Sequence, residues 1–78
     1  MRDNIAKLED RLGRLEDVRG RRQENLNRLE DMLCAARSDS YRDRVEGWID
    51  EERERINEIE NKIHLMRGWL SEMRAKLD

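Results

Sequence analysis

Few side chains in this sequence could carry specific chemistry, and the most distinctive of them are charged. Arg19, Arg21 and Arg22 lie together in the first half of the chain, and Glu52 interrupts an apolar pattern in the second half. Guanidinium groups form paired hydrogen bonds with carboxylates and phosphates. These residues could therefore pair with carboxylates of the protein itself and fix the alignment of its parts, or they could bind an anionic ligand. We favour the first interpretation.

Catalytic and metal-binding chemistry finds little support in the sequence. Cys34 and His64 are the only cysteine and the only histidine, whereas structural zinc sites are built mainly from several such residues. Glu60 precedes His64 by four residues, which is not the spacing of di-iron helical bundles. No basic group has an expected place beside Cys34 to make it a nucleophile. The sequence therefore predicts no enzymatic activity, no cofactor and no metal.

The composition excludes most fold classes. The chain has 78 residues, of which 46% are charged and 36% hydrophobic, and it contains neither proline nor phenylalanine. Folds with sheets need β-branched and aromatic runs separated by turn residues, and such runs are missing here. We therefore expect one small all-α domain. Seventeen basic and 19 acidic residues give a net charge of -2, which would not steer the protein towards nucleic acid or a membrane.

The expected location of the protein is the cytoplasm. A secretory signal needs an apolar run of about 7 to 15 residues, and a membrane span needs a longer one. The longest apolar run here has five residues, at positions 32–36. A single cysteine cannot form an internal disulfide, which agrees with a reducing compartment.

Apolar residues recur at alternating spacings of three and four, which is the heptad pattern of coiled coils. We call the two apolar positions of each heptad, a and d, the seam positions. In the first half of the chain they are Ile5, Leu8, Leu12, Leu15, Arg19, Arg22, Leu26, Leu29, Leu33 and Ala36. In the second half they are Val45, Ile49, Glu52, Ile56, Ile59, Ile63, Met66, Leu70, Met73 and Leu77.

The two heptad patterns are out of phase with each other. Ile5 and Ile49 both occupy position a, and they are 44 residues apart, whereas six whole heptads span 42. Ser40 followed by Asp43 resembles the capping box that starts a helix. We therefore predict a single domain over 1–78, with helices at about 3–36 and 41–77 joined by a turn at about 37–40. Folded back at this turn, the chain forms an antiparallel two-helix hairpin of the coiled-coil type.

The register of this hairpin also follows from the heptads. In an antiparallel pair, position a of one helix faces position d of the other, so the numbers of facing residues add up to a constant. The heptads allow only values seven apart, such as 71, 78 and 85. Of these, 78 centres the fold on Asp39, inside the predicted turn. Arg22 and Glu52 then fall in neighbouring layers at mid-length, where a polar pair would fix the register at some cost in stability.

The two edges of the predicted hairpin differ in polarity. The e positions, which line one edge, contain no apolar residue. The g positions, which line the other, include Val18, Met32, Tyr41, Trp48 and Trp69. A two-helix hairpin has no interior deep enough to cover a tryptophan, so we expect this edge to contact another chain. The simplest product is a homodimer in which two hairpins form a four-helix bundle.

These patterns favour a non-enzymatic protein–protein interaction module that binds itself and another protein. A small cytoplasmic regulator, inhibitor or adaptor, including one encoded by a phage, would fit this size and surface. The alternative is nucleic-acid or nucleotide binding by the segment 19–22. In length and plan the hairpin resembles the bacterial Rop-type RNA-binding dimers, and that resemblance implies a basic face at Arg11, Arg14, Arg21 and Arg28. Acidic residues alternate with these arginines, which argues against strong phosphate binding.

Overall fold

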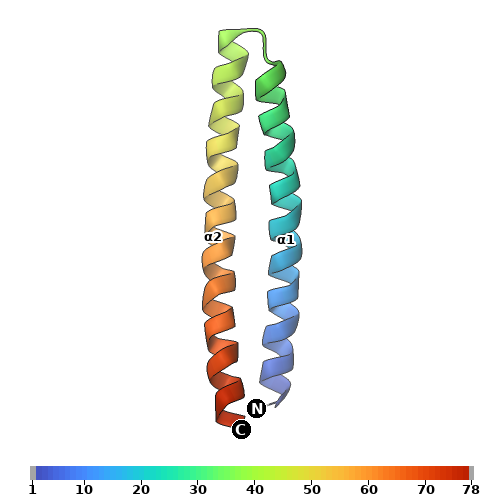
Figure 1. Cartoon of the computed structure of the whole chain (residues 1–78), viewed down its shortest axis with the longest axis vertical. Coiled ribbons are helices and arrows are strands. Elements are labelled where there is room, and N and C mark those ends of the chain that lie inside the picture. Colours follow the sequence, from blue (N-terminus) through green and yellow to red (C-terminus); the bar gives the residue numbers. More distant parts are fainter. Residues whose placement is uncertain (1, 78) are drawn as a thin grey trace.

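Two long antiparallel helices make up the protein (Figure 1). The computed structural model describes residues 2–77, in which α1 (Arg2–Ala35) and α2 (Asp39–Leu77) are joined by a short turn. The hairpin measures 59 × 14 × 13 Å between Cα atoms, and the start of α1 and the end of α2 lie at the end opposite the turn. No strand occurs among the described residues. The predicted all-α helical hairpin is therefore confirmed.

The heptad pattern explains which side chains are buried between the helices. Every predicted seam position is buried or half-buried except Arg19 and Leu77. Since removal of apolar surface from water is the main driving force for folding, this seam holds the two helices together. A cluster of buried residues lies in the half of the hairpin nearer the turn, and it consists of Leu26, Val45, Ile49 and Ile56, with Leu29 and Leu33 packed against them.

The turn differs in detail from the sequence prediction. Ser38, rather than Ser40, caps α2, because its Oγ accepts a hydrogen bond from the backbone N–H of Tyr41 at 3.2 Å. The backbone carbonyl of Ser38 also accepts the N–H of Arg42 at 3.0 Å, which starts the helical hydrogen bonding. As a result α2 begins at Asp39, two residues before the predicted start, and Ser40 lies inside the helix. The predicted capping box of Ser40 and Asp43 is wrong.

The contacts between the helices agree with the predicted register. Antiparallel seams whose residue numbers add up to 78 bring together e positions whose numbers add up to 76 or 83. Three ion pairs cross the e edge, and the numbers in each add up to 83: Glu9–Arg74, Glu16–Arg67 and Glu30–Arg53. Near the seam, Asn25 donates a hydrogen bond to Glu52 at 3.3 Å. The numbers of Asn25 and Glu52 add up to 77, close to the predicted 78, so residues whose numbers add up to about 78 lie at the same level along the hairpin.

Candidate functional site

The most buried polar group of the hairpin is the carboxylate of Glu52. Its residue is only 4% exposed. Arg22 donates from Nη1 to both carboxylate oxygens, at 3.1 and 3.4 Å, and Asn25 donates from Nδ2 to Oε2. The Arg22 side chain is 36% exposed, so it bridges the seam and the solvent. Because a buried charge is costly unless it is paired and hydrogen-bonded, this contact fixes which turn of α1 lies against Glu52.

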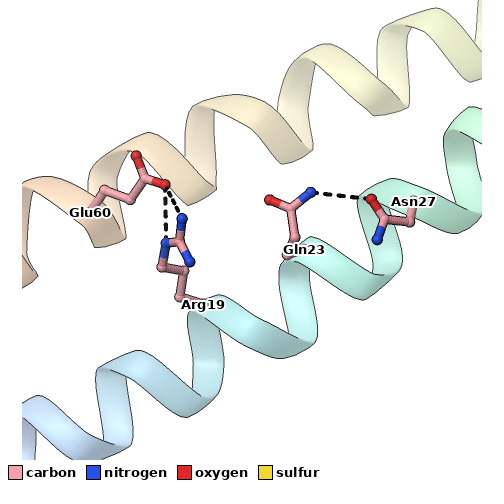
Figure 2. Close-up of polar contacts among 4 residues, drawn as sticks. All are labelled: Arg19, Gln23, Asn27 and Glu60. Carbon is pink, nitrogen blue, oxygen red and sulfur yellow. Dashed lines mark hydrogen bonds and ion pairs between the residues drawn. The ribbon is translucent and has the colours of Figure 1, made fainter.

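Arg19 behaves differently from Arg22, although both occupy seam positions. Its side chain leaves the seam and donates from Nε and Nη2 to Oε1 of Glu60 at 3.0 and 2.8 Å (Figure 2). Gln23 is the e-position residue across from Glu60, and it carries no charge. Its amide donates instead to Asn27 at 3.2 Å on its own helix. Glu60 therefore pairs with Arg19, which lies one helical turn before Gln23 on α1.

The predicted set of three arginines is thus divided. Arg22 and Arg19 are bound to separate carboxylates of α2, whereas Arg21 is exposed and forms no ion pair within residues 2–77. The two paired guanidinium groups would have to give up these contacts before they could bind another anion. The geometry supports the register interpretation of Arg22 and Glu52, and it shows no convergent anion site around the three arginines.

A shallow groove lies beside Arg19 on the e edge. It has a volume of about 630 Å³, and its lining consists of Glu16, Arg19, Glu60, Ile63, His64 and Arg67. Four of the charged side chains are already joined in ion pairs, because Glu16 accepts from Arg67 at 2.9 Å and Glu60 accepts from Arg19. The positive and negative charges that line the groove therefore neutralise each other, and the groove presents no unpaired arginine or glutamate from residues 2–77 to a ligand. Cys34, the one thiol, is free and exposed on α1 away from this groove.

The opposite edge carries most of the exposed apolar surface. Six large apolar side chains with exposed fractions of 37 to 54% lie there, and we call them together the Trp flank: Val18, Met32, Tyr41, Trp48, Leu65 and Trp69. The tryptophans are 44% and 51% exposed. They are 21 residues apart, or about 30 Å along the helix. The five g residues predicted from the sequence therefore share one edge of the hairpin.

Leu65 belongs to this flank but was not predicted from the sequence. It occupies position c, which borders position g on the outer surface of α2, and it is 54% exposed. It lies one turn before Trp69, and both residues line a hollow of about 140 Å³ together with Leu15, Lys62 and Met66. A signal was present, because the neighbouring c positions of α2 are glutamates at 51, 58 and 72.

The glycines that precede the tryptophans are not required by packing inside the hairpin. A Cβ atom added at Gly47 or Gly68 would meet no atom within 4 Å, and neither residue has a positive φ angle. Glycine lowers helix stability by about 1 kcal/mol relative to alanine. Nothing within the single hairpin offsets that loss.

Comparisons with known proteins do not assign this chain to a family. No family model, curated protein or solved structure matches it. Residues 2–77 contain no group of three or more histidine, cysteine, aspartate or glutamate side chains placed to hold a metal ion. Neither described helix is both long enough and apolar enough to cross a membrane.

Proposed function

We propose that this protein is a protein–protein interaction module that associates with a second copy of itself through the Trp flank. The observation that carries the proposal is the gathering of six exposed apolar side chains, two of them tryptophans, on one edge of the hairpin. Large apolar side chains exposed along one edge, here with Arg55 and Lys62 between the two tryptophans, are typical of interfaces that combine apolar anchors with polar surroundings. Tryptophan is also among the residues that contribute most to binding when they are buried in an interface.

The two edges of the hairpin fit different roles. The e edge carries ion pairs between α1 and α2, as in Arg67 with Glu16, so its charges are used within one chain. The Trp flank has no comparable set of ion pairs among residues 2–77. An interface with an apolar centre and a polar rim can therefore form on the Trp flank without breaking contacts of the hairpin.

The dimensions of the hairpin also fit this proposal. The flank extends along a hairpin that is 59 Å long and is two helices, or about 20 Å, wide. A standard stable interface buries roughly 800 Å² of accessible surface per partner, and a flank that runs the length of the hairpin can bury an area of that order. A rod of this kind could occlude or bridge a further protein, which is the work of a small regulator, inhibitor or adaptor.

Replacement of both tryptophans tests the proposal. The Trp48→Ala/Trp69→Ala variant should sediment as a monomer at concentrations where the wild-type protein is a dimer. Its helix content by circular dichroism should change little, since both side chains lie outside the seam. Leu77→Ala is the matched control, because Leu77 is 45% exposed but lies off the flank; it should leave the mass of the dimer unchanged. An unchanged mass for the tryptophan variant would refute the proposal.

Nucleic-acid binding through the segment 19–22 is less well supported. Two of its arginines are engaged by Glu52 and Glu60, and Asp10 forms an ion pair with Arg14 at 3.1 Å on the same helix. Phosphate contacts would give an affinity that falls steeply with salt. Titration with RNA and DNA at two salt concentrations distinguishes this function from protein binding.

A further inference from the structure

We infer that the second copy lies with its α2 against α1 of the first, related by a two-fold axis parallel to the long axis of the hairpin. This inference rests on the proposed function, because it assumes that the Trp flank is the interface. It comes from the c positions, which form the outer border of that flank. Between residues 7 and 28 of α1 they are basic, and between residues 51 and 72 of α2 they are mainly acidic: Lys7, Arg14, Arg21 and Arg28 face outward on α1, and Glu51, Glu58, Leu65 and Glu72 on α2. The pattern ends near the turn, where the c positions are Ala35 on α1 and Arg44 on α2.

The two sets of c positions are also matched in level. Within one hairpin the numbers of seam residues at the same level add up to 78, and c positions at the same level add up to 79. Arg21 is therefore level with Glu58, and Arg28 is level with Glu51. Lys7 and Glu72 form a third such pair near the chain ends. At the fourth level Arg14 lies opposite Leu65, where the long aliphatic part of arginine can cover apolar surface.

Two symmetric arrangements can bring two Trp flanks together. A two-fold axis parallel to the hairpin places α1 of one copy beside α2 of the other and preserves the level of every residue. Each basic c position then borders an acidic one of the second copy, as with Arg21 and Glu58. An axis perpendicular to the hairpin places α1 beside α1 and α2 beside α2, so that c positions of like charge border one another. Opposite charges across an interface favour the first arrangement.

The spacing of charge on α2 favours a second copy over a polyanion. The g edge of this helix contains Arg55 and Lys62, and each follows a glutamate by four residues, at Glu51 and Glu58. Residues four apart are neighbours on a helix surface. A phosphate that approached Arg55 or Lys62 would therefore be repelled by the neighbouring glutamate. The basic c positions on α1 of a second copy can instead form ion pairs with these glutamates.

The exposed thiol of Cys34 provides a direct measurement of this arrangement. Cys34 lies at a b position, on the side of α1 away from the Trp flank, so a spin label there leaves the interface free. With a parallel axis the two labels lie at the same level, within about 30 Å of each other across the bundle. With a perpendicular axis they lie towards opposite ends of the bundle, about 40 Å or more apart. Pulsed electron–electron resonance distinguishes the two distances.

Charge reversal tests the same pairing through affinity. Arg21→Glu/Arg28→Glu and Glu51→Arg/Glu58→Arg should each raise the dissociation constant of the dimer at least about tenfold, because several pairs become like-charged. The variant with all four changes should recover most of the wild-type affinity. Asp43→Arg/Asp50→Arg is the matched control, since it reverses two charges of α2 at b positions, on the side of the e edge and away from the flank, and it should have little effect. Helix content is measured for each variant.

The outcomes separate this inference from the proposed function. A dimer with a short distance between labels and recovery by the four-residue exchange supports both. A dimer with a long distance, or with affinity insensitive to either charge reversal, overturns the arrangement and leaves the proposed function standing. A wild-type protein that stays monomeric overturns both, and binding of that monomer to a single-stranded oligonucleotide would identify a polyanion as the occupant instead.

Discussion

Glu52 is a carboxylate in an otherwise apolar seam, and its partners decide whether that position stabilises the hairpin. With Arg22 and Asn25 in place, the charge is paired and hydrogen-bonded. A contact of this kind contributes less to stability than to the choice of alignment, because both groups lose solvation when they are brought together. The contact between Arg22 and Glu52 therefore selects one alignment of the two helices. The neighbouring apolar layers alone would specify that alignment less strictly.

Removal of Arg22 should therefore be costly. Arg22→Ala leaves the buried carboxylate with Asn25 as its remaining donor, and we expect the free energy of unfolding to fall by about 2 to 4 kcal/mol. Urea unfolding at a fixed protein concentration measures the change. Arg53→Ala is the control, because Arg53 pairs with Glu30 on the e edge, away from the Trp flank, at side-chain exposures of 61% and 47%, where such pairs contribute little. Equal losses for the two variants would contradict the role assigned to Glu52.

Joint replacement of the pair should separate stability from register. In Arg22→Leu/Glu52→Leu no charge remains in the seam, so thermal stability should be equal to or higher than that of the wild-type protein. The register should become less strict, and this is measured as additional distances between spin labels placed on the two helices. A less stable variant with one sharp distance would show that the pair stabilises the fold and does not select the register.

At the scale of the helices, the seam and the approximate place of the turn could be predicted from the sequence, and the residue that caps α2 could not. The 3–4 spacing reports directly which residues face the other helix, and its phase break shows that the chain must fold back. The start of α2 depends on which serine hydroxyl reaches a free N–H group, and both Ser38 and Ser40 are suitable types. The sequence favoured Ser40, whereas the structure uses Ser38.

The Ser38 cap makes a prediction with a built-in control. Ser38→Ala removes the acceptor for the N–H of Tyr41, and it should lower the free energy of unfolding by about 1 kcal/mol. Ser40→Ala alters a residue in the first turn of α2 that does not accept this bond, and it should change stability by a few tenths of a kcal/mol at most. Thermal unfolding followed by circular dichroism measures both. A larger loss for Ser40→Ala would restore the original capping prediction.

Glycines within the helices give a second prediction at this scale. Gly13 lies at a b position of α1, and a Cβ atom there would meet no atom within 4 Å. Gly13→Ala should therefore raise the free energy of unfolding by about 0.5 to 1 kcal/mol through helix propensity alone. Urea unfolding measures this gain. Destabilisation would mean that something outside the hairpin approaches α1 closely at this position.

Arg19 and Leu65 show why part of the candidate site escaped sequence analysis. Arg19 occupies a seam position, but its direction depends on the uncharged Gln23, which leaves Glu60 without a cation directly opposite. That relation becomes visible only after the register is known. Leu65 occupies position c, which is glutamate in neighbouring heptads of α2 at 51, 58 and 72. That apolar exception was the signal in the sequence, and the structure shows that Leu65 and Trp69 line the same hollow.

For the whole molecule, the two edges of the hairpin carry different kinds of surface. One edge is closed by ion pairs between the two helices, and the other combines exposed tryptophans with bordering charges that are basic on α1 and acidic on α2. Such a molecule is self-complementary when two copies meet with the same edge inward. Association and folding should therefore be coupled, and the melting temperature should rise with protein concentration.

The solution mass tests this account most directly. Sedimentation equilibrium across micromolar concentrations should give twice the mass of the 9.5 kDa chain, and the mass should fall towards that of one chain on dilution. The account predicts that the tryptophan fluorescence then shifts to longer wavelength, as Trp48 and Trp69 become exposed to water. A mass of one chain throughout the concentration range would contradict the central claim that the Trp flank binds a second copy.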